Sequence, residues 1–212
     1  YEDFGTAMLG RLRGMFAFAL WDTRKRLLFM ARDRLGKKPL NYAPVGNGLL
    51  FCSELHPLAT SGHVSRELDP VALAAYLTAG SVPAPRTIYR AIRKLPPGHF
   101  LTWQAEETRV ERYWRLDFSR KFTGSREEAR ECVRAKLDEG IRLRLRSDVP
   151  LGLLLSGGLD SNAVLARLTR GLGQRVRTFT IGFEEERYDE SALARRSAEF
   201  FGVEHSELRG RP

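Results

Sequence analysis

Residues 156–161, Ser-Gly-Gly-Leu-Asp-Ser, carry the most specific chemical signal in this sequence. They stand between an apolar run that predicts a strand and a segment that predicts a helix. Glycines Gly157 and Gly158 lack a Cβ and let backbone amides approach an anion, while the helix N-terminus adds unpaired N–H groups and the positive end of its dipole. The hydroxyls of Ser156 and Ser161 supply further donors. The pattern predicts a cradle for phosphate or pyrophosphate.

Asp160 places a carboxylate inside this cradle. A carboxylate repels phosphate unless a divalent cation lies between them, so we assign Asp160 as a magnesium ligand and as the catalytic residue. The loop is not a Walker A motif, because GxxxxGK[ST] and its lysine are absent. Ser156 is not a hydrolase nucleophile, because the GxSxG elbow is missing. The structural alternative is a glycine turn in which Asp160 and Ser161 only cap the helix.

Alternating strands and helices are expected to position this loop. Predicted strands cover residues 151–155, 176–183 and 203–208, and predicted helices cover residues 162–170 and 191–201. A βαβαβ order with right-handed crossovers makes the strands parallel and predicts the first part of a doubly wound nucleotide-binding sheet. Before it, apolar residues at every fourth position from Arg126 predict a helix of about twenty residues.

The first half of the chain is typical of a layered α/β structure. After a short helix at the start, predicted strands cover residues 15–22, 27–31, 49–52, 99–104 and 109–114, the last two as a hairpin. The first of these strands is apolar on both faces, which indicates cover on both sides. Asp69 as N-cap, Pro70 at the first helical position and Gly80 as the stop predict a helix. Polar residues from Ser119 onward mark the expected boundary between two domains, 1–118 and 119–212.

The composition excludes several classes of protein. With 212 residues, 42% hydrophobic and 29% charged, the chain can bury a core and is too apolar to be disordered. Its net charge of +9 raises nucleic acid as a partner. In residues 126–146, however, acids and bases interleave as on a solvated helix face, and no nucleic-acid-binding motif accompanies them. We therefore expect no nucleic-acid partner.

The cysteines and histidines show no metal-ligand spacing. Cys52 and Cys132 lie in an apolar run and on a helix face, where packed thiols are expected. So few cysteines fit a reducing cytoplasm. No apolar run approaches the ~18 residues of a membrane helix, so no membrane partner is expected.

Residues 146–161 resemble the pyrophosphate loop of glutamine-hydrolysing asparagine synthetases, including the strand before it. Further segments resemble that family's glutaminase domain at residues 13–22, 31–36, 38–40 and 53–55, and its link into the synthetase domain at residues 94–99 and 113–114. The resemblance therefore follows the family's order along nearly the whole chain. It implies the C-terminal half of a layered αββα glutaminase domain followed by an ATP-pyrophosphatase-type synthetase domain.

The resemblance implies ATP-dependent, glutamine-using amide synthesis, in which aspartate becomes asparagine through an aspartyl adenylate. Carried over to this sequence, the nucleotide-binding residues are Leu154, Ser156, Gly157, Gly158, Leu159, Asp160, Ser161 and Ile181. ATP and Mg²⁺ are then the cofactors, and ATP, aspartate and glutamine are the small-molecule partners. The sequence leaves the number of subunits open, with a homodimer as one arrangement.

The resemblance also indicates an internal fragment of a longer enzyme. In the family, a catalytic cysteine and the residues that grip glutamine precede the point matching Tyr1. The aspartate-binding segments and an activating lysine follow the point matching Pro212. We expect the chain alone to be inactive. Two alternatives stay open: a relative that amidates or cyclises another carboxylate, such as a β-lactam synthetase or a biosynthetic-cluster enzyme, and a non-catalytic remnant.

Overall fold

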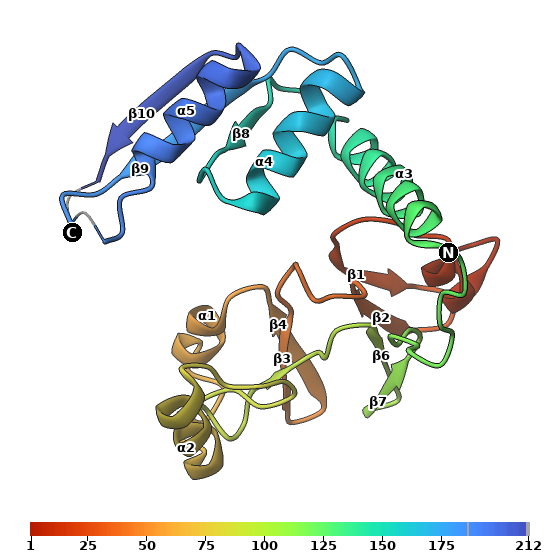
Figure 1. Ribbon diagram of the computed structural model, residues 1–212. Coiled ribbons are helices and arrows are strands. Elements are labelled where there is room, and N and C mark those ends of the chain that lie inside the picture. The colour runs from red at the N-terminus through yellow and green to blue at the C-terminus, as the bar shows by residue number, and fades with distance from the viewer. Residues whose placement is uncertain (186, 211–212) are drawn as a thin grey trace. The chain divides into compact units, whose positions relative to one another are not determined.

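The structure is a computed structural model that describes residues 1–185 and 187–210. The chain is α/β and divides into two compact units, Tyr1–Ser119 and Arg120–Pro212 (Figure 1). Within the described ranges, no helix combines the length and the apolar character needed to cross a membrane.

Two antiparallel sheets form the first unit. Its elements are η1 (Gly5–Gly10, a 3₁₀ helix), β1 (Ala17–Asp22), β2 (Leu27–Arg32), β3 (Asn41–Val45), β4 (Gly48–Cys52), α1 (Leu55–Thr60), α2 (Pro70–Ala79), β5 (Arg93–Lys94), β6 (His99–Gln104) and β7 (Glu107–Arg112). One sheet has the order β1-β2-β6-β7, and the other has the order β4-β3-β5. The sequence did not predict β3 or α1.

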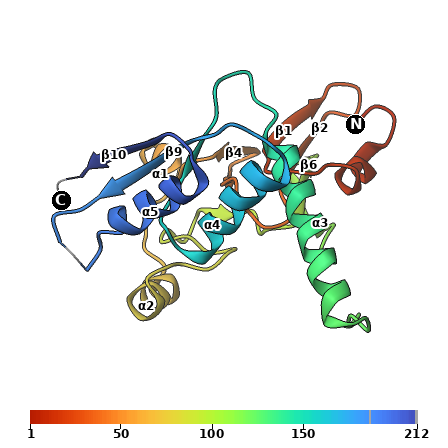
Figure 2. The ribbon, with the colours of Figure 1, turned by 45° about the horizontal axis from the view of Figure 1, so that its top comes forward.

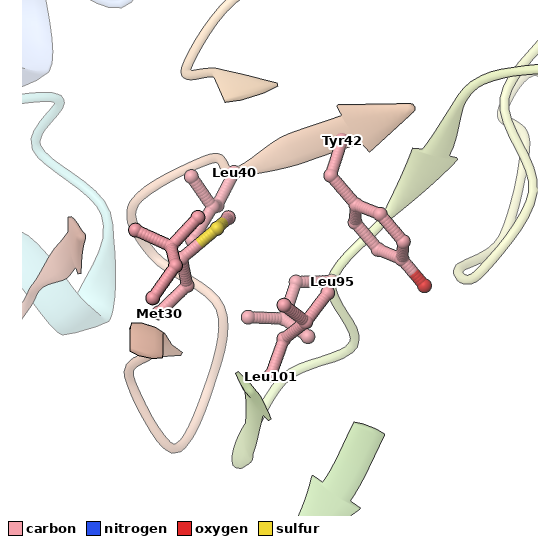
Figure 3. Close-up of a cluster of buried hydrophobic side chains, with 6 residues drawn as sticks. Met30, Leu40, Tyr42, Leu95 and Leu101 are labelled. Atoms are coloured by element: carbon pink, nitrogen blue, oxygen red, sulfur yellow. The ribbon is translucent and has the colours of Figure 1, made fainter. Parts of the chain in front are cut away.

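A buried cluster joins the two sheets (Figure 3). Met30 and Leu101 come from the four-stranded sheet, and Tyr42 comes from β3 of the three-stranded sheet. Leu40 directly precedes β3, and Leu95 directly follows β5. Met30, Leu95 and Leu101 are fully buried. Burying a large apolar side chain contributes about 1.5–3 kcal/mol, so this cluster helps to hold the two sheets together.

Strand β2 is buried on both faces because its side chains alternate between two clusters. Met30 faces the second sheet, whereas Phe29 packs with Leu9 of η1 on the other side. Strand β1 was expected to be covered on both sides, and this prediction is wrong. On one face of β1 both Ala19 and Trp21 are exposed, Trp21 to 48%.

The helix predicted after Asp69 is confirmed. The Asp69 carboxylate accepts hydrogen bonds from the backbone N–H groups of Val71 and Ala72, and Gly80 ends the helix at φ 68°. The predicted hairpin also forms. Its second strand begins two residues earlier than expected, because the turn consists of Ala105 and Glu106, both at positive φ.

Arg32 and Asp33 hold the loop of residues 34–39 through hydrogen bonds to its backbone. The Arg32 guanidinium donates to the carbonyls of Gly36, Lys38 and Leu95. Asp33, 2% exposed, accepts from four backbone N–H groups, those of Phe16, Leu35, Lys37 and Lys38.

The second unit has the predicted βαβαβ order. Its elements are α3 (Arg126–Arg144), β8 (Gly152–Leu154), α4 (Leu159–Ala166), the π-helical turn η2 (Arg167–Gly171), β9 (Arg177–Gly182), α5 (Ser191–Phe201) and β10 (His205–Arg209). The strands are parallel in the order β10-β9-β8. Because both crossovers run in the same direction along the sheet, α4 and α5 cover the same face of it (Figures 1 and 2). Between the helices and the sheet, the core consists of Leu155, Leu165, Ala194 and Ala198.

Helix α3 begins with a capping box. The Ser125 hydroxyl accepts from the backbone N–H of Glu128, and the Glu128 carboxylate accepts from the N–H of Ser125. Its apolar stripe is buried at Ile141 but 67% exposed at Val133. Cys132, next to Val133, is exposed, so the expectation of a packed thiol is wrong there. It holds in part for Cys52, which is half-buried.

Candidate functional site

The glycine loop leaves the sheet at the carboxyl ends of its parallel strands. Leu155 follows β8, is buried, and donates its N–H to the carbonyl of Phe179 at 2.8 Å. The hydroxyl of Thr180 donates to the Leu155 carbonyl. These bonds fix the chain against β9 just before the loop begins. The loop therefore opens at the edge where parallel sheets of this kind bind ligands.

Gly157 is required by both conformation and space. Its φ of +76° lies in the left-handed region, which glycine adopts without penalty. A Cβ there would lie 2.5 Å from Cβ of Leu193 and 2.8 Å from the backbone nitrogen of Ala194. The loop thus packs directly against the first turn of α5, while Gly158, Leu159 and Asp160 are exposed.

Helix α4 begins earlier than expected, at Leu159 rather than Asn162. Gly158 is the N-cap, in an extended conformation and without a side-chain cap. Asp160 and Ser161 therefore lie inside the first helical turn, so the alternative in which they cap the helix is wrong. The Asp160 side chain is exposed beside the positive end of the helix dipole, where a negative charge is stabilised.

Three donor groups gather on one side of the loop. The Ser156 and Ser161 hydroxyl oxygens lie 3.0 Å apart, and the N–H of Gly158 donates to the Ser156 oxygen at 3.3 Å. The Ser161 hydroxyl also donates a hydrogen bond to the Gly158 carbonyl oxygen at 3.1 Å. A Cβ on Gly158 would lie 3.3 Å from the Ser156 hydroxyl and so would intrude on this side. The loop can present hydroxyl and amide donors to one anion.

Leu154 is the last residue of β8, and Ile181 lies one residue before the end of the neighbouring strand β9. Leu154 pairs with Phe179, which lies two residues before Ile181. The pleat therefore puts all three on one face, the face opposite α4 and α5. Leu154 is 75% and Ile181 51% exposed. Leu159, also assigned to the site, is 86% exposed at the start of α4.

Two polar residues were not assigned to the site from the sequence, Asn162 at the loop and Asp189 in the segment before α5. Asn162 donates its side-chain N–H to the Gly157 carbonyl at 2.7 Å. Asp189 accepts the N–H of Ser191 at 3.0 Å, and the hydroxyl and N–H of Ser191 hold the pKa of Asp189 below its ordinary value. Glu190, the N-cap of α5, makes no side-chain cap hydrogen bond, and Asp189 is the acid of this segment that accepts from the N–H of Ser191. The Asn162 bond could not be predicted from the sequence, because it depends on the orientation of one peptide in the folded loop.

The protein groups at the loop could hold a metal ion only together with a bound molecule that supplies further oxygen atoms. Within residues 1–185 and 187–210, no group of three or more His, Cys, Asp or Glu side chains could hold a metal ion. Asp160 alone offers a carboxylate at the loop. A cation would therefore be shared between Asp160 and the oxygens of a bound phosphate, which is how Mg²⁺ commonly binds at nucleotide sites.

Comparison with known families divides the chain in a similar way. Residues 1–114 match the family described as Glutamine amidotransferase domain, and residues 132–212 match the family described as Asparagine synthase. The loop of residues 156–161 lies within the second match. Together the matches define a chain in which a glutamine amidotransferase domain precedes a synthase domain. The chain belongs to the glutamine-hydrolysing asparagine synthetase family, whose members are carbon–nitrogen ligases.

Individual relatives agree with this assignment. A protein of Mycobacterium tuberculosis (strain H37Rv) named putative asparagine synthetase [glutamine-hydrolyzing] is 40% identical over 212 residues, covering 97% of this chain and 32% of that protein. Asparagine synthetase [glutamine-hydrolyzing] 3 of Bacillus subtilis is 32% identical, covering 97% of this chain and 36% of that protein. Amidase chyE of Penicillium rubens is 34% identical, covering 96% of this chain and 32% of that protein. The chain thus spans about a third of the length of these relatives.

Proposed function

We propose that the enzyme containing this chain makes an amide from a carboxylate, using ATP and the ammonia of glutamine. Residues 1–118 belong to the layered αββα glutaminase domain, and residues 119–212 begin the ATP-binding synthetase domain. The observation that carries the proposal is the loop of residues 156–161. It gathers donors at the carboxyl edge of a parallel sheet, within the part of the chain that matches the synthase family. We propose a cytoplasmic location, which the scarcity of cysteine supports.

The loop would hold the β- and γ-phosphates of ATP. The hydroxyls of Ser156 and Ser161 and the N–H of Gly158 would donate to phosphate oxygens, exchanging the bonds that they now make with one another. The first turn of α4 adds backbone donors that no side chain caps. Leu154 and Ile181 would offer apolar surface to the adenosine. These residues would bind the nucleotide and stabilise pyrophosphate as it leaves.

The residues present fit a magnesium ion bound to pyrophosphate. Gly157 and Gly158 leave the cradle free of Cβ atoms, and Asp160 offers an exposed carboxylate at its rim. Bound magnesium would screen the negative charge of the phosphates. Asp160 would orient the nucleotide by holding the magnesium ion that its phosphates bind.

The chemical sequence has two steps. An oxygen of the substrate carboxylate attacks the α-phosphorus of ATP, the bond to the β-phosphate oxygen breaks, and an acyl adenylate and pyrophosphate form. Ammonia from glutamine then attacks the acyl carbon, and AMP leaves with the original carboxylate oxygen. For the family, aspartate is the expected carboxylate and asparagine the product.

The acceptor carboxylate has a second candidate. A relative named an amidase is as similar to this chain as one of the relatives named asparagine synthetases. A different carboxylate, amidated or cyclised, is therefore the alternative within the same chemistry.

The test uses the full-length enzyme with glutamine, MgATP and a carboxylate labelled with oxygen-18. We expect aspartate to drive pyrophosphate release and to transfer label to AMP. Pyrophosphate release with another carboxylate alone would identify the alternative substrate. Label in inorganic phosphate would show an acyl phosphate and overturn the adenylate route. No phosphate product with any carboxylate would overturn the proposed function.

A further inference from the structure

We infer that Asn162 is a positioning residue that locks the Gly157–Gly158 peptide in the orientation needed to bind an anion. The inference rests on the proposed function of the loop and adds to it a residue with no part in the assigned cradle. It begins with one hydrogen bond, from the Asn162 side-chain amide to the Gly157 carbonyl oxygen at 2.7 Å.

The Gly157–Gly158 peptide has little intrinsic reason to keep one orientation. Both flanking residues are glycines, which tolerate the φ and ψ changes that accompany a peptide flip. In one orientation the peptide offers its N–H to the cradle. In the other it offers its carbonyl oxygen, which repels phosphate. A loop of this sequence therefore needs an external contact to select the first orientation.

Asn162 supplies that contact. In a trans peptide the carbonyl and the N–H point in opposite directions, so a carbonyl held toward Asn162 turns the N–H of Gly158 the other way. That N–H donates to the Ser156 hydroxyl oxygen, which in turn lies 3.0 Å from the hydroxyl of Ser161. The Asn162 hydrogen bond therefore fixes the orientation of the same peptide that contributes the Gly158 N–H to the group of donors.

The other half of the Asn162 amide indicates why asparagine stands here. Its Oδ1 is buried and has no hydrogen-bond partner among the described residues. A buried acceptor without a partner destabilises the fold, so this side chain contributes through its donor. The opposite amide orientation would place Oδ1 against the Gly157 carbonyl, two acceptors facing each other. Asn162 therefore acts as an N–H donor to the loop.

The test compares Asn162→Asp and Asn162→Ala in the full-length enzyme. Aspartate keeps the size of the side chain but sets a carboxylate against the Gly157 carbonyl, which favours the flipped peptide. Alanine removes the donor without adding charge. We expect magnesium pyrophosphate to bind about tenfold or more weakly to Asn162→Asp, and less weakly to Asn162→Ala. The KM for ATP should rise in the same order, while kcat for glutamine hydrolysis stays unchanged.

Gln104→Glu is the matched control, because Gln104 donates its side-chain amide to the Lys25 carbonyl at the same distance, 2.7 Å, in the other unit. It should leave pyrophosphate affinity unchanged. A high-resolution structure of Asn162→Asp should show the Gly157 carbonyl turned away from residue 162.

The outcomes separate the inference from the function on which it rests. Wild-type pyrophosphate affinity in both Asn162 variants, or a lower melting temperature with no loss of affinity, would overturn the positioning role alone. If Asn162→Asp fails to fold, Asn162→Ala decides by the same affinity measurement. A wild-type enzyme that binds neither MgATP nor magnesium pyrophosphate would overturn the proposed function and the inference together.

Discussion

The hydroxyl oxygens of Ser156 and Ser161 lie 3.0 Å apart, although one residue follows strand β8 and the other belongs to helix α4. The left-handed turn at Gly157 reverses the chain, and the first turn of α4 then brings Ser161 back to Ser156. Two hydroxyls this close can donate to the same anion. They should therefore act as a unit rather than as independent contacts.

Replacing either serine by alanine should weaken nucleotide binding without unfolding the protein. Ser156→Ala and Ser161→Ala each remove one hydroxyl donor, and we expect about three- to tenfold weaker binding of magnesium pyrophosphate. The double variant should bind more tightly than the product of the two single effects predicts, because each hydroxyl loses its partner when the other is removed. Calorimetric titration of the four proteins measures this coupling.

Ser197→Ala serves as the control for the serine pair. Ser197 is a half-buried serine of α5 whose hydroxyl donates to the Leu193 carbonyl, so this substitution removes a hydroxyl from the same unit outside the loop. Strictly additive losses for Ser156 and Ser161 would mean that the two hydroxyls meet different ligands or none in common.

Gly157→Ala should destabilise the protein more than the same change at Gly173. Both glycines have positive φ, +76° and +63°, so both substitutions strain the backbone by about 1–2 kcal/mol. At Gly173 no atom lies within 4 Å of the added Cβ, whereas at Gly157 the Cβ meets Leu193 and Ala194. Urea unfolding gives the free energy of unfolding of each variant. The difference between the two losses is the steric cost of the methyl group at position 157. Equal losses would show that α5 yields to the added methyl group.

The sequence predicted most of the second unit because its signals are local. In the first unit, Asp69 and Gly80 likewise mark the two ends of a helix by residue type alone, and both were placed correctly. Strand β3 was missed because Asn41 and Pro44 are poor strand residues. Pro44 is tolerated because β5 pairs with Asn41 and Tyr42, and among the described residues the Pro44 end of β3 has no strand partner on that side.

The site was predictable as a segment but not as a geometry. Six consecutive residues, 156–161, could be named from their types and order. Asn162 could not, because its role depends on which way one peptide faces in the folded loop. The turn at Ala105 and Glu106 was misplaced for a related reason, since neither residue type signals positive φ.

Asp33→Asn should destabilise the first unit. The Asp33 carboxylate accepts hydrogen bonds from four backbone N–H groups, and the residue is 2% exposed. An amide in its place would point its own N–H donors at some of these backbone donors. We expect a loss of about 2–4 kcal/mol at neutral pH. Asp117→Asn is the control, because Asp117 is exposed and bonds only locally to Ser119. Urea unfolding of the two variants measures the difference, which should be much smaller for Asp117.

The effect of Asp33 should depend on pH. Burial alone would raise the pKa of Asp33, but the hydrogen bonds from Lys38, Lys37, Leu35 and Phe16 outweigh it and lower the pKa from its ordinary value of 3.8. A lowered folded-state pKa contributes stability that is complete above the unfolded pKa and is lost as the pH falls through the folded pKa. The stability gap between wild type and Asp33→Asn should therefore be constant above about pH 5 and shrink below about pH 4. A gap that widens on acidification would contradict this cause.

Asp160→Asn gives the sharpest test of the loop. The substitution keeps the size of the side chain but removes the charge that a magnesium ion requires. Gly158, not Asp160, is the N-cap of α4, so the change removes no cap and the melting temperature should barely move. In the full-length enzyme we expect ATP-to-pyrophosphate turnover to fall by about a hundredfold or more, because a charge aimed at the reacting phosphates acts mainly in the transition state. Glutamine hydrolysis should stay nearly intact.

The control for Asp160→Asn is Glu199→Gln, which removes an exposed carboxylate from α5 in the same unit. It should leave both reactions unchanged, which separates the position of the charge from the net charge of the unit. Raising the magnesium concentration should partly restore turnover in Asp160→Asn if the carboxylate acts by holding the cation, because a weaker site fills at higher concentration. Near-normal pyrophosphate release by a well-folded Asp160→Asn enzyme would mean that residues 156–161 form only a turn. The proposal that this loop binds the phosphates of ATP would then be wrong.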